Sequence, residues 1–94
     1  MIKIDTSPVR YWSYLDEKSF FEWAQEIPCV KSIDGGFFHI KSKRLSESDL
    51  RDLVAIMHRY NMPMKQLQQF CNAKNEHWFK SKKMYWYSAI FGDA

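Results

Sequence analysis

Hydrophobic and polar positions change their spacing along the chain, and each change predicts a different element. In the first segment, Ile2 and Ile4 alternate with polar residues, which indicates a short strand. From residue 16 the spacing becomes helical, and one apolar stripe contains Phe20, Trp23, Ala24 and Ile27. We predict a helix here that is capped by Asp16 or Ser19 and that ends at Pro28.

A β-hairpin is predicted for residues 30–40. Residues that favour strands lie on both sides of Asp34-Gly35-Gly36, and glycine adopts the positive φ angles of a tight turn at little cost. Phe38 and Ile40 would then share one face of the second strand. Because an isolated hairpin is only marginally stable in water, we expect it to pack on helices or to gain a third strand, for which Met1–Asp5 is the candidate.

The clearest helix signal begins at Ser46. Ser46 is the expected N-cap and Asp49 stands at the third helical position, which makes a capping box with Asp in place of Glu. Leu45 and Leu50 lie on either side of this cap, at the positions of a hydrophobic staple. The apolar face of this helix then comprises Leu50, Leu53, Val54, Met57 and Tyr60.

The rest of the chain predicts further helices. Asn61-Met62-Pro63 ends one helix and starts the next, whose buried side comprises Met64, Leu67, Phe70 and Cys71. Asn75 is expected to cap a short helical turn, and Ser81 a last helix that Gly92 stops. The predicted fold class is therefore α+β, in a single globular domain over residues 1–94. It has an N-terminal helix, a β-hairpin with a candidate third strand, and then three to four packed helices.

Composition supports one real core, since 46% of the residues are hydrophobic and 17% are aromatic. Cys29 and Cys71 lie within apolar patterns without motif spacing, so we expect reduced thiols. We find no signal peptide pattern and no segment of membrane-spanning length, and we therefore expect a cytoplasmic protein without a membrane partner. The net charge of +3 is unevenly distributed, with six acidic and four basic residues in residues 1–34.

No residue pattern predicts catalysis. The histidines and cysteines lack the paired spacing of a metal site. The one imaginable nucleophile is Cys71 with His58 or His77, and no glycine beside Cys71 shapes a nucleophile turn. We therefore expect a protein that is not an enzyme and that has no metal, no cofactor and no small-molecule substrate.

Nucleic-acid binding is the alternative function. Residues 46–60 and 63–71 could form a helix-turn-helix, although the turn lacks a glycine. The second helix would present residues that contact bases: Lys65, Gln66, Gln68, Gln69 and Asn72. Nearby lysines that could reach phosphates are Lys74, Lys80, Lys82 and Lys83.

Aromatic residues are concentrated near the C-terminal end. Trp78-Phe79 and Tyr85-Trp86-Tyr87 cannot all face inward, because adjacent helical residues point in different directions. Tyr85 or Trp86 is then partly exposed unless it packs under Tyr11-Trp12, and we expect Trp12 and Trp86 to cover each other in an enlarged core. An exposed aromatic residue bordered by lysine is typical of a binding hot spot.

The pattern LRDLVAIMHRYNMPMKQLQQF, followed by NEHWF and MYWYSAIFG, resembles small bacterial immunity proteins of polymorphic toxin systems. These include the contact-dependent growth inhibition and Rhs types, and the resemblance covers residues 45–92. It implies a protein that binds one cognate toxin domain, the C-terminal domain of a larger secreted protein. The inhibition would be stoichiometric and would need neither catalysis nor a cofactor.

Acidic residues suggest where such a toxin would bind. Inhibitors of nucleases usually present acidic surface, and Glu22 and Glu26 share an outward helical face although the whole chain is basic. The candidate partner-binding residues are Asp16, Glu17, Glu22, Glu26, Lys80, Tyr85 and Trp86.

Overall fold

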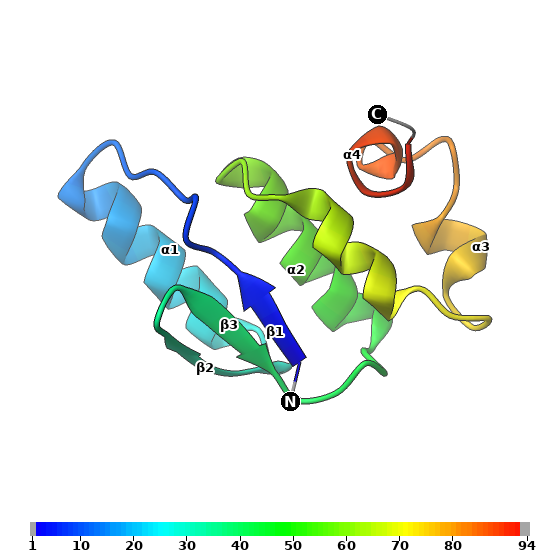
Figure 1. Cartoon of the computed structure of the whole chain (residues 1–94), viewed down its shortest axis with the longest axis horizontal. Helices are drawn as coiled ribbons and strands as arrows, with labels where there is room; N and C mark the ends of the chain where they lie inside the picture. The colour runs from blue at the N-terminus through cyan, green and yellow to red at the C-terminus, as the bar shows by residue number, and fades with distance from the viewer. Residues whose placement is uncertain (1, 93–94) are drawn as a thin grey trace.

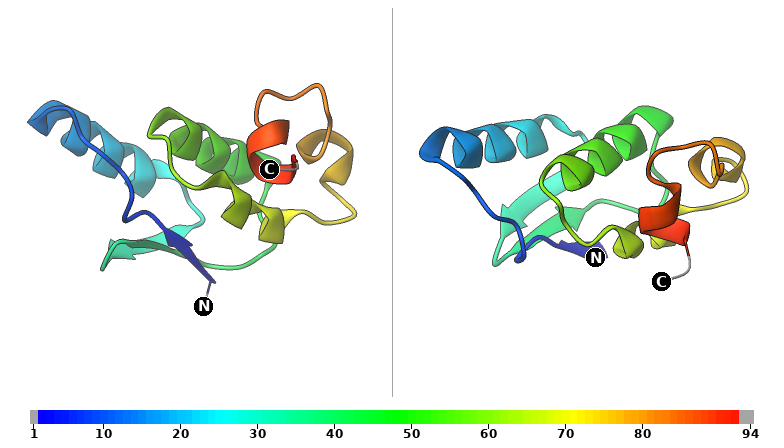
Figure 2. Two further views of the ribbon diagram at one scale, coloured as in Figure 1. Left: turned by 45° about the horizontal axis from the view of Figure 1, so that its top comes forward. Right: turned by 90° about the horizontal axis from the view of Figure 1, so that it is seen from above.

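A three-stranded antiparallel sheet forms one layer of the molecule, and two helices pack across one of its faces (Figures 1 and 2). The computed structural model describes residues 2–92. Its elements, in chain order, are β1 (Ile2–Asp5), α1 (Tyr14–Glu26), β2 (Val30–Asp34), β3 (Phe37–Ile40), α2 (Glu47–Arg59), the 3₁₀ helix η1 (Met64–Phe70), α3 (Glu76–Phe79) and α4 (Tyr87–Phe91). Helices α1 and α2 cover the sheet, η1 lies beside the β1 edge, and α3 and α4 extend the molecule beyond α2 (Figures 1 and 2).

The hairpin predicted for residues 30–40 is confirmed. Gly35 and Gly36 have φ angles of +57° and +82°, as the two-residue turn between β2 and β3 requires. Strand β3 lies in the centre of the sheet, between β1 and β2. Phe38 and Ile40 are buried on one face of β3, as predicted from their alternation.

The candidate third strand is also found. Ile2–Asp5 pairs with β3, and Ile4 lies opposite Phe38 on the buried face of the sheet. Met1 lies outside the described residues.

Helix α2 forms as predicted. The Ser46 hydroxyl accepts a hydrogen bond from the Asp49 N–H at 3.0 Å, which is the expected cap. At the other end, Asn61 has a φ of +57°, and the Met62 N–H reaches back to the Met57 carbonyl at 2.9 Å. This bond satisfies a carbonyl group in the last turn of the helix, and the positive φ of Asn61 redirects the chain into η1.

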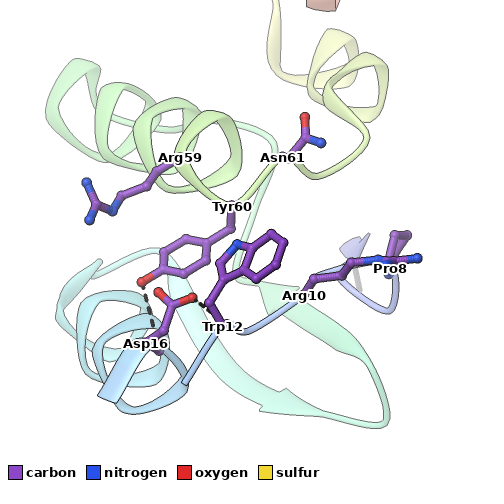
Figure 3. A pocket seen from close by; sticks show the side chains of 7 residues that line it. All are labelled: Pro8, Arg10, Trp12, Asp16, Arg59, Tyr60 and Asn61. Atoms are coloured by element: carbon purple, nitrogen blue, oxygen red, sulfur yellow. Dashed lines mark hydrogen bonds between the residues drawn. The ribbon is translucent and has the colours of Figure 1, made fainter. Parts of the chain in front are cut away.

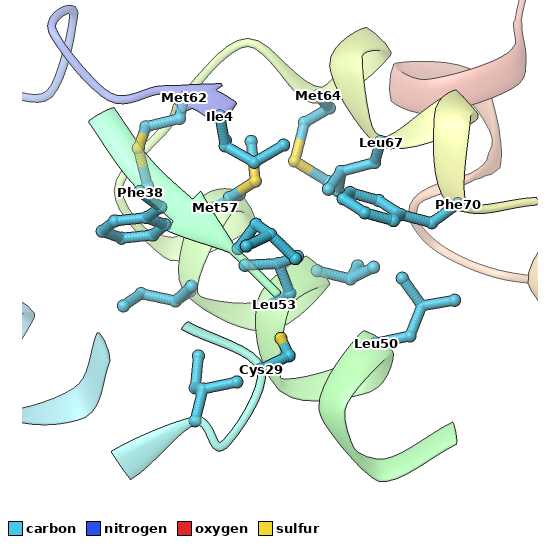
Figure 4. Close-up of a cluster of buried hydrophobic side chains, with 14 of the residues drawn as sticks. Ile4, Cys29, Phe38, Leu50, Leu53, Met57, Met62, Met64, Leu67 and Phe70 are labelled. Carbon is cyan, nitrogen blue, oxygen red and sulfur yellow. The ribbon is translucent and has the colours of Figure 1, made fainter. Parts of the chain in front are cut away.

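A single apolar core fills the space between the sheet and the helices (Figure 4). Ile4 and Phe38 enter it from the sheet, and Leu53 and Met57 enter it from α2. One side of η1 closes it with Met64, Leu67 and Phe70. Each fully buried side chain of this size stabilises the fold by about 1.5–3 kcal/mol, so the core fixes α2 against the sheet.

The predicted fold description was wrong in its order and in its helix content. The chain begins with strand β1 and not with a helix. The segment predicted as a helix over residues 63–71 is a 3₁₀ helix, and α3 and α4 are only four and five residues long. The last helix begins at Tyr87, whereas Ser81 occupies a turn. The structure is a mixture of helices and a three-stranded sheet in the order β-α-β-β followed by helices.

Both differences have physical causes. Strand β1 is only four residues long, and it joins the sheet by pairing with residues more than thirty positions away, so the local alternation of Ile2 and Ile4 indicated a strand without fixing its place in the fold. In η1, the buried residues Met64, Leu67 and Phe70 are three positions apart. A spacing of three places them on one face of a helix with three residues per turn, so the 3₁₀ form buries all three.

Gln66 joins η1 to the outer edge of β1. Its side-chain oxygen accepts a hydrogen bond from the Asp5 N–H at 2.8 Å, and its side-chain nitrogen donates to the Asp5 carbonyl at 2.9 Å. The amide thus replaces the backbone of a fourth strand at this position and covers part of an exposed sheet edge.

Replacing Gln66 with alanine is expected to lower the free energy of unfolding by about 1–2 kcal/mol, because both backbone groups of Asp5 lose their partner. Urea denaturation of the Gln66→Ala variant measures this change. The matched control is Gln69→Ala, since the Gln69 side chain is exposed and donates only to a carbonyl within η1. Equal losses in the two variants would show that Gln66 does not hold β1.

Candidate protein-binding surface

Among residues 2–92, the three most exposed large apolar side chains lie within four residues at the start of α1. Trp12 is 90% exposed, Tyr14 is 74% exposed and Leu15 is 68% exposed. We call these three residues the apolar tip. The first turn of α1 extends away from the rest of the molecule (Figure 1). Exposed large apolar side chains that are grouped in this way make a candidate site of interaction.

The exposure of the apolar tip results from the sequence of α1 itself. Phe20, Ala24 and Ile27 face the core. One turn before Phe20, the positions on the same helical face are Asp16 and Glu17, which are acidic. The first turn therefore has its polar residues on the core side, and its apolar residues are directed elsewhere.

Hydrogen bonds fix the backbone that carries Trp12. The Ser13 hydroxyl caps α1 by accepting from the Asp16 N–H at 3.1 Å. The Asp16 carboxylate in turn accepts from the Trp12 N–H at 3.1 Å. This reciprocal pair is a variant of the capping box, and it holds the chain before α1 in one direction. Trp12 is thus presented on an ordered backbone, which lowers the entropy lost on binding.

A pocket of about 420 Å³ lies beside Trp12, between the segment before α1 and the end of α2 (Figure 3). Its floor includes Tyr60, whose hydroxyl donates to the Asp16 carbonyl at 3.3 Å and whose ring meets Phe20 edge-on at 4.9 Å. Burial, and then the nearby Asp16 carboxylate, raise the pKa of Tyr60, so the hydroxyl stays protonated and keeps this bond. Tyr60 therefore links α1 to α2 beneath the apolar tip.

Two arginines border this pocket without converging on it. Arg10 and Arg59 extend to opposite sides in Figure 3. Within residues 2–92 neither side chain forms an ion pair. The pocket is therefore a shallow apolar and polar recess beside Trp12, and it lacks the paired guanidinium groups that hold a phosphate.

Helix α1 continues the surface with acidic residues. Leu15, Glu22 and Glu26 are separated by seven and four positions, so they lie along one line of the helix. Both glutamates are exposed, and Lys18 pairs with Glu22 at 3.6 Å. An apolar tip followed by carboxylates is a suitable surface for a partner that combines an apolar recess with basic groups.

The predicted binding residues separate into two groups. Asp16, Glu17, Glu22 and Glu26 all lie on α1, where Asp16 also serves the cap. Lys80 and Tyr85 lie near α3 and α4, which are at the far end of the molecule from the first turn of α1 (Figure 1). The structure does not bring the two groups together.

Trp86 is a core residue. Its side chain is 3% exposed, and its indole N–H donates to the Phe79 carbonyl at 2.7 Å. The expected packing of Trp86 under Trp12 is also not found, since Trp86 contacts Trp78 and Phe79. Tyr85 is the exposed member of the pair, at 59%, and its ring contacts His58.

Sequence reasoning missed the exposed apolar tip because it began α1 at the wrong place. The helix starts at Tyr14 with Ser13 as its N-cap, and Asp16 is the third helical residue. The signal was present, since Ser13 and Asp16 have the same spacing as the cap recognised at the start of α2.

The glutamines proposed to read bases make bonds within the protein instead. Gln66 holds β1, and Gln68 donates to the Ile90 carbonyl of α4. Gln69 donates to the Gln66 carbonyl, and the Asn72 side chain accepts from backbone N–H groups of its own turn. Their element is also a short 3₁₀ helix and not an α-helix that fits a major groove. We therefore do not assign base recognition to η1.

The surroundings of Cys29 and Cys71 do not favour the reactive thiolate form. Both are free thiols, and burial raises the pKa of Cys29 to about 12 and also raises the pKa of Cys71. Neutral thiols are weak nucleophiles and poor metal ligands. Across the described part of the chain, no three His, Cys, Asp or Glu residues converge as metal ligands.

None of the helices within residues 2–92 has both the length and the apolar character needed to cross a membrane. Comparison with protein-family models, with curated proteins and with solved structures finds no match for this chain.

Proposed function

We propose that this chain is an immunity protein that neutralises a toxin domain by binding it stoichiometrically through α1. The observation that carries the proposal is the apolar tip, where Trp12, Tyr14 and Leu15 are exposed on a capped and ordered turn. Exposed tryptophan and tyrosine on a fixed backbone are the residues that most often dominate binding energy at protein interfaces.

The class of partner comes from the resemblance of residues 45–92 to immunity proteins of polymorphic toxins. Those residues form α2, η1, α3 and α4, of which α2 packs against α1, and they do not include the apolar tip. The resemblance therefore supports a shared scaffold, and the α1 surface would determine which toxin is recognised. The proposal places the protein in the cytoplasm, where the toxin domain acts.

Local charge favours a basic toxin. Helix α1 carries four acidic residues, Asp16, Glu17, Glu22 and Glu26, and one basic residue, Lys18. The chain as a whole has a net charge of +3, so α1 differs in sign from its surroundings. An acidic helix steers a basic partner to this surface and increases the association rate at low salt.

Bacterial growth provides the test of this function. The toxin domain encoded by the reading frame just upstream is induced in cells with and without this protein. We expect growth arrest that the wild-type protein relieves when it is produced in at least equal amount, because the proposed inhibition is stoichiometric. A toxin that arrests growth equally in both strains, or a domain that is not toxic, would contradict the proposal.

A further inference from the structure

A second recess lies at the opposite end of α2 from the apolar tip. It has a volume of about 740 Å³, and it runs between the segment 43–47, which leads into α2, and the segment 69–78, which joins η1 to α3. We call it the cationic groove. Its size exceeds that needed for a single inorganic anion and suits a short segment of a larger ligand.

The charges around the cationic groove are mostly of one sign. Lys43, Arg44 and Lys74 line it, and none of them forms an ion pair within residues 2–92. The one acidic residue in the lining is Glu47, whose carboxylate accepts a hydrogen bond from the Arg51 side chain at 2.8 Å. Glu47 is therefore paired, and three cations in the lining have no ion pair, whereas Glu76 is an acidic residue close to the lining residue Cys71.

Apolar side chains are also present in the lining. Leu45 comes from one wall, and Cys71 and Trp78 come from the other, all of them partly buried. The Arg51 guanidinium lies over the Trp78 ring at 4.4 Å and holds it in place. A cation thus covers one ring face of Trp78, and this side chain contributes to the apolar lining of the groove.

Side-chain hydrogen bonds order both walls before any ligand binds. Asn75 accepts from the Asn72 N–H at 2.8 Å and donates to the Phe70 carbonyl at 2.8 Å, which fixes the turn that carries Lys74. On the other wall, the Ser42 hydroxyl accepts from the Arg44 N–H at 2.9 Å. The backbone from which Lys74 and Arg44 extend is therefore ordered before a ligand binds.

We infer that the cationic groove binds an acidic segment of a partner protein, with one apolar side chain between Leu45 and Trp78 and carboxylates beside Lys43, Arg44 and Lys74. Complementary charge identifies the segment as acidic, and the apolar lining identifies it as a peptide with an apolar anchor. The inference does not depend on the function proposed for α1, since the two surfaces lie at opposite ends of α2.

Fluorescence anisotropy with a defined probe tests this inference. The probe is a fluorescein-labelled peptide of about ten residues in which Asp and Glu surround one central leucine. We expect saturable binding to the intact chain that weakens at least about tenfold in a Lys43→Glu, Lys74→Glu variant. The control is Lys82→Glu with Lys83→Glu, which changes the net charge equally at exposed residues outside the groove. The control is expected to bind within about twofold of wild type.

Three outcomes would overturn the inference. The first is the absence of saturable binding, and the second is an equal loss in the two charge variants, which would indicate general attraction. The third is displacement of the peptide by a single-stranded oligonucleotide of equal charge at equal concentration, which would indicate nucleic-acid binding. A probe with glycine in place of leucine should bind at least about fivefold more weakly. Unchanged affinity would show that the leucine does not contribute to binding, and that part of the inference would be wrong. Urea midpoints of all variants confirm that the fold is retained.

Discussion

Replacing Trp12 with alanine is expected to weaken binding of the toxin domain by at least about 100-fold, or about 2.7 kcal/mol. Trp12 is 90% exposed in the unbound protein, so its whole indole is available for burial in an interface. A tryptophan of this kind contributes a large contact area with only two rotatable bonds to fix. Isothermal titration calorimetry with the purified toxin domain measures the change.

The stability of the Trp12→Ala variant is expected to equal that of wild type within about 0.5 kcal/mol. The bond that orders this segment is made by the Trp12 backbone N–H to Asp16, and alanine retains it. Urea denaturation therefore separates loss of binding from loss of fold. A variant that unfolds more readily and binds as tightly as wild type would contradict the assignment of Trp12 to the surface.

Replacing Trp86 with alanine is expected to have the opposite result, a loss of about 3–5 kcal/mol of folding free energy. The Trp86 ring is packed against Trp78 and Phe79, so its removal leaves a large cavity between α2 and the C-terminal helices. The Phe79 carbonyl also loses its hydrogen bond from the indole N–H. The change is measured as a shift of the urea midpoint.

Trp86→Phe provides the matched comparison, because it retains an aromatic ring and removes the N–H donor. We expect an intermediate loss, of which about 1–2 kcal/mol is due to the unsatisfied carbonyl. If Trp86→Ala unfolds at the wild-type urea concentration, Trp86 does not support the C-terminal helices as described. It would then return to the set of candidate binding residues.

Local signals predicted the elements that are defined locally. The Ser46 and Asp49 cap identified α2, and the Asp34-Gly35-Gly36 turn identified the hairpin, because neighbouring residues determine both structures. The alternation of Phe38 and Ile40 predicted which face of β3 is buried for the same reason.

The environments of individual side chains, which depend on how the elements pack together, were not predictable in this way. Trp12 and Trp86 are both aromatic residues in mixed surroundings, and one is exposed while the other is buried. The difference arises because Trp86 can donate to the Phe79 carbonyl across a turn, whereas Trp12 precedes a helical turn whose core-facing residues are acidic. The roles of Gln66 and Gln68 likewise depend on β1 and α4, which lie far from them in sequence.

The α1 surface can be tested most directly by titrating the purified toxin domain into three proteins in parallel: wild type, Trp12→Ala and Tyr85→Ala. Tyr85 is the matched control because it is also an exposed aromatic residue, and its ring contacts His58 of α2. We predict that only Trp12→Ala loses affinity, by at least about 100-fold, and that Tyr85→Ala binds within about twofold of wild type. Unchanged affinity for Trp12→Ala together with a large loss for Tyr85→Ala would contradict the assignment of α1 as the binding surface.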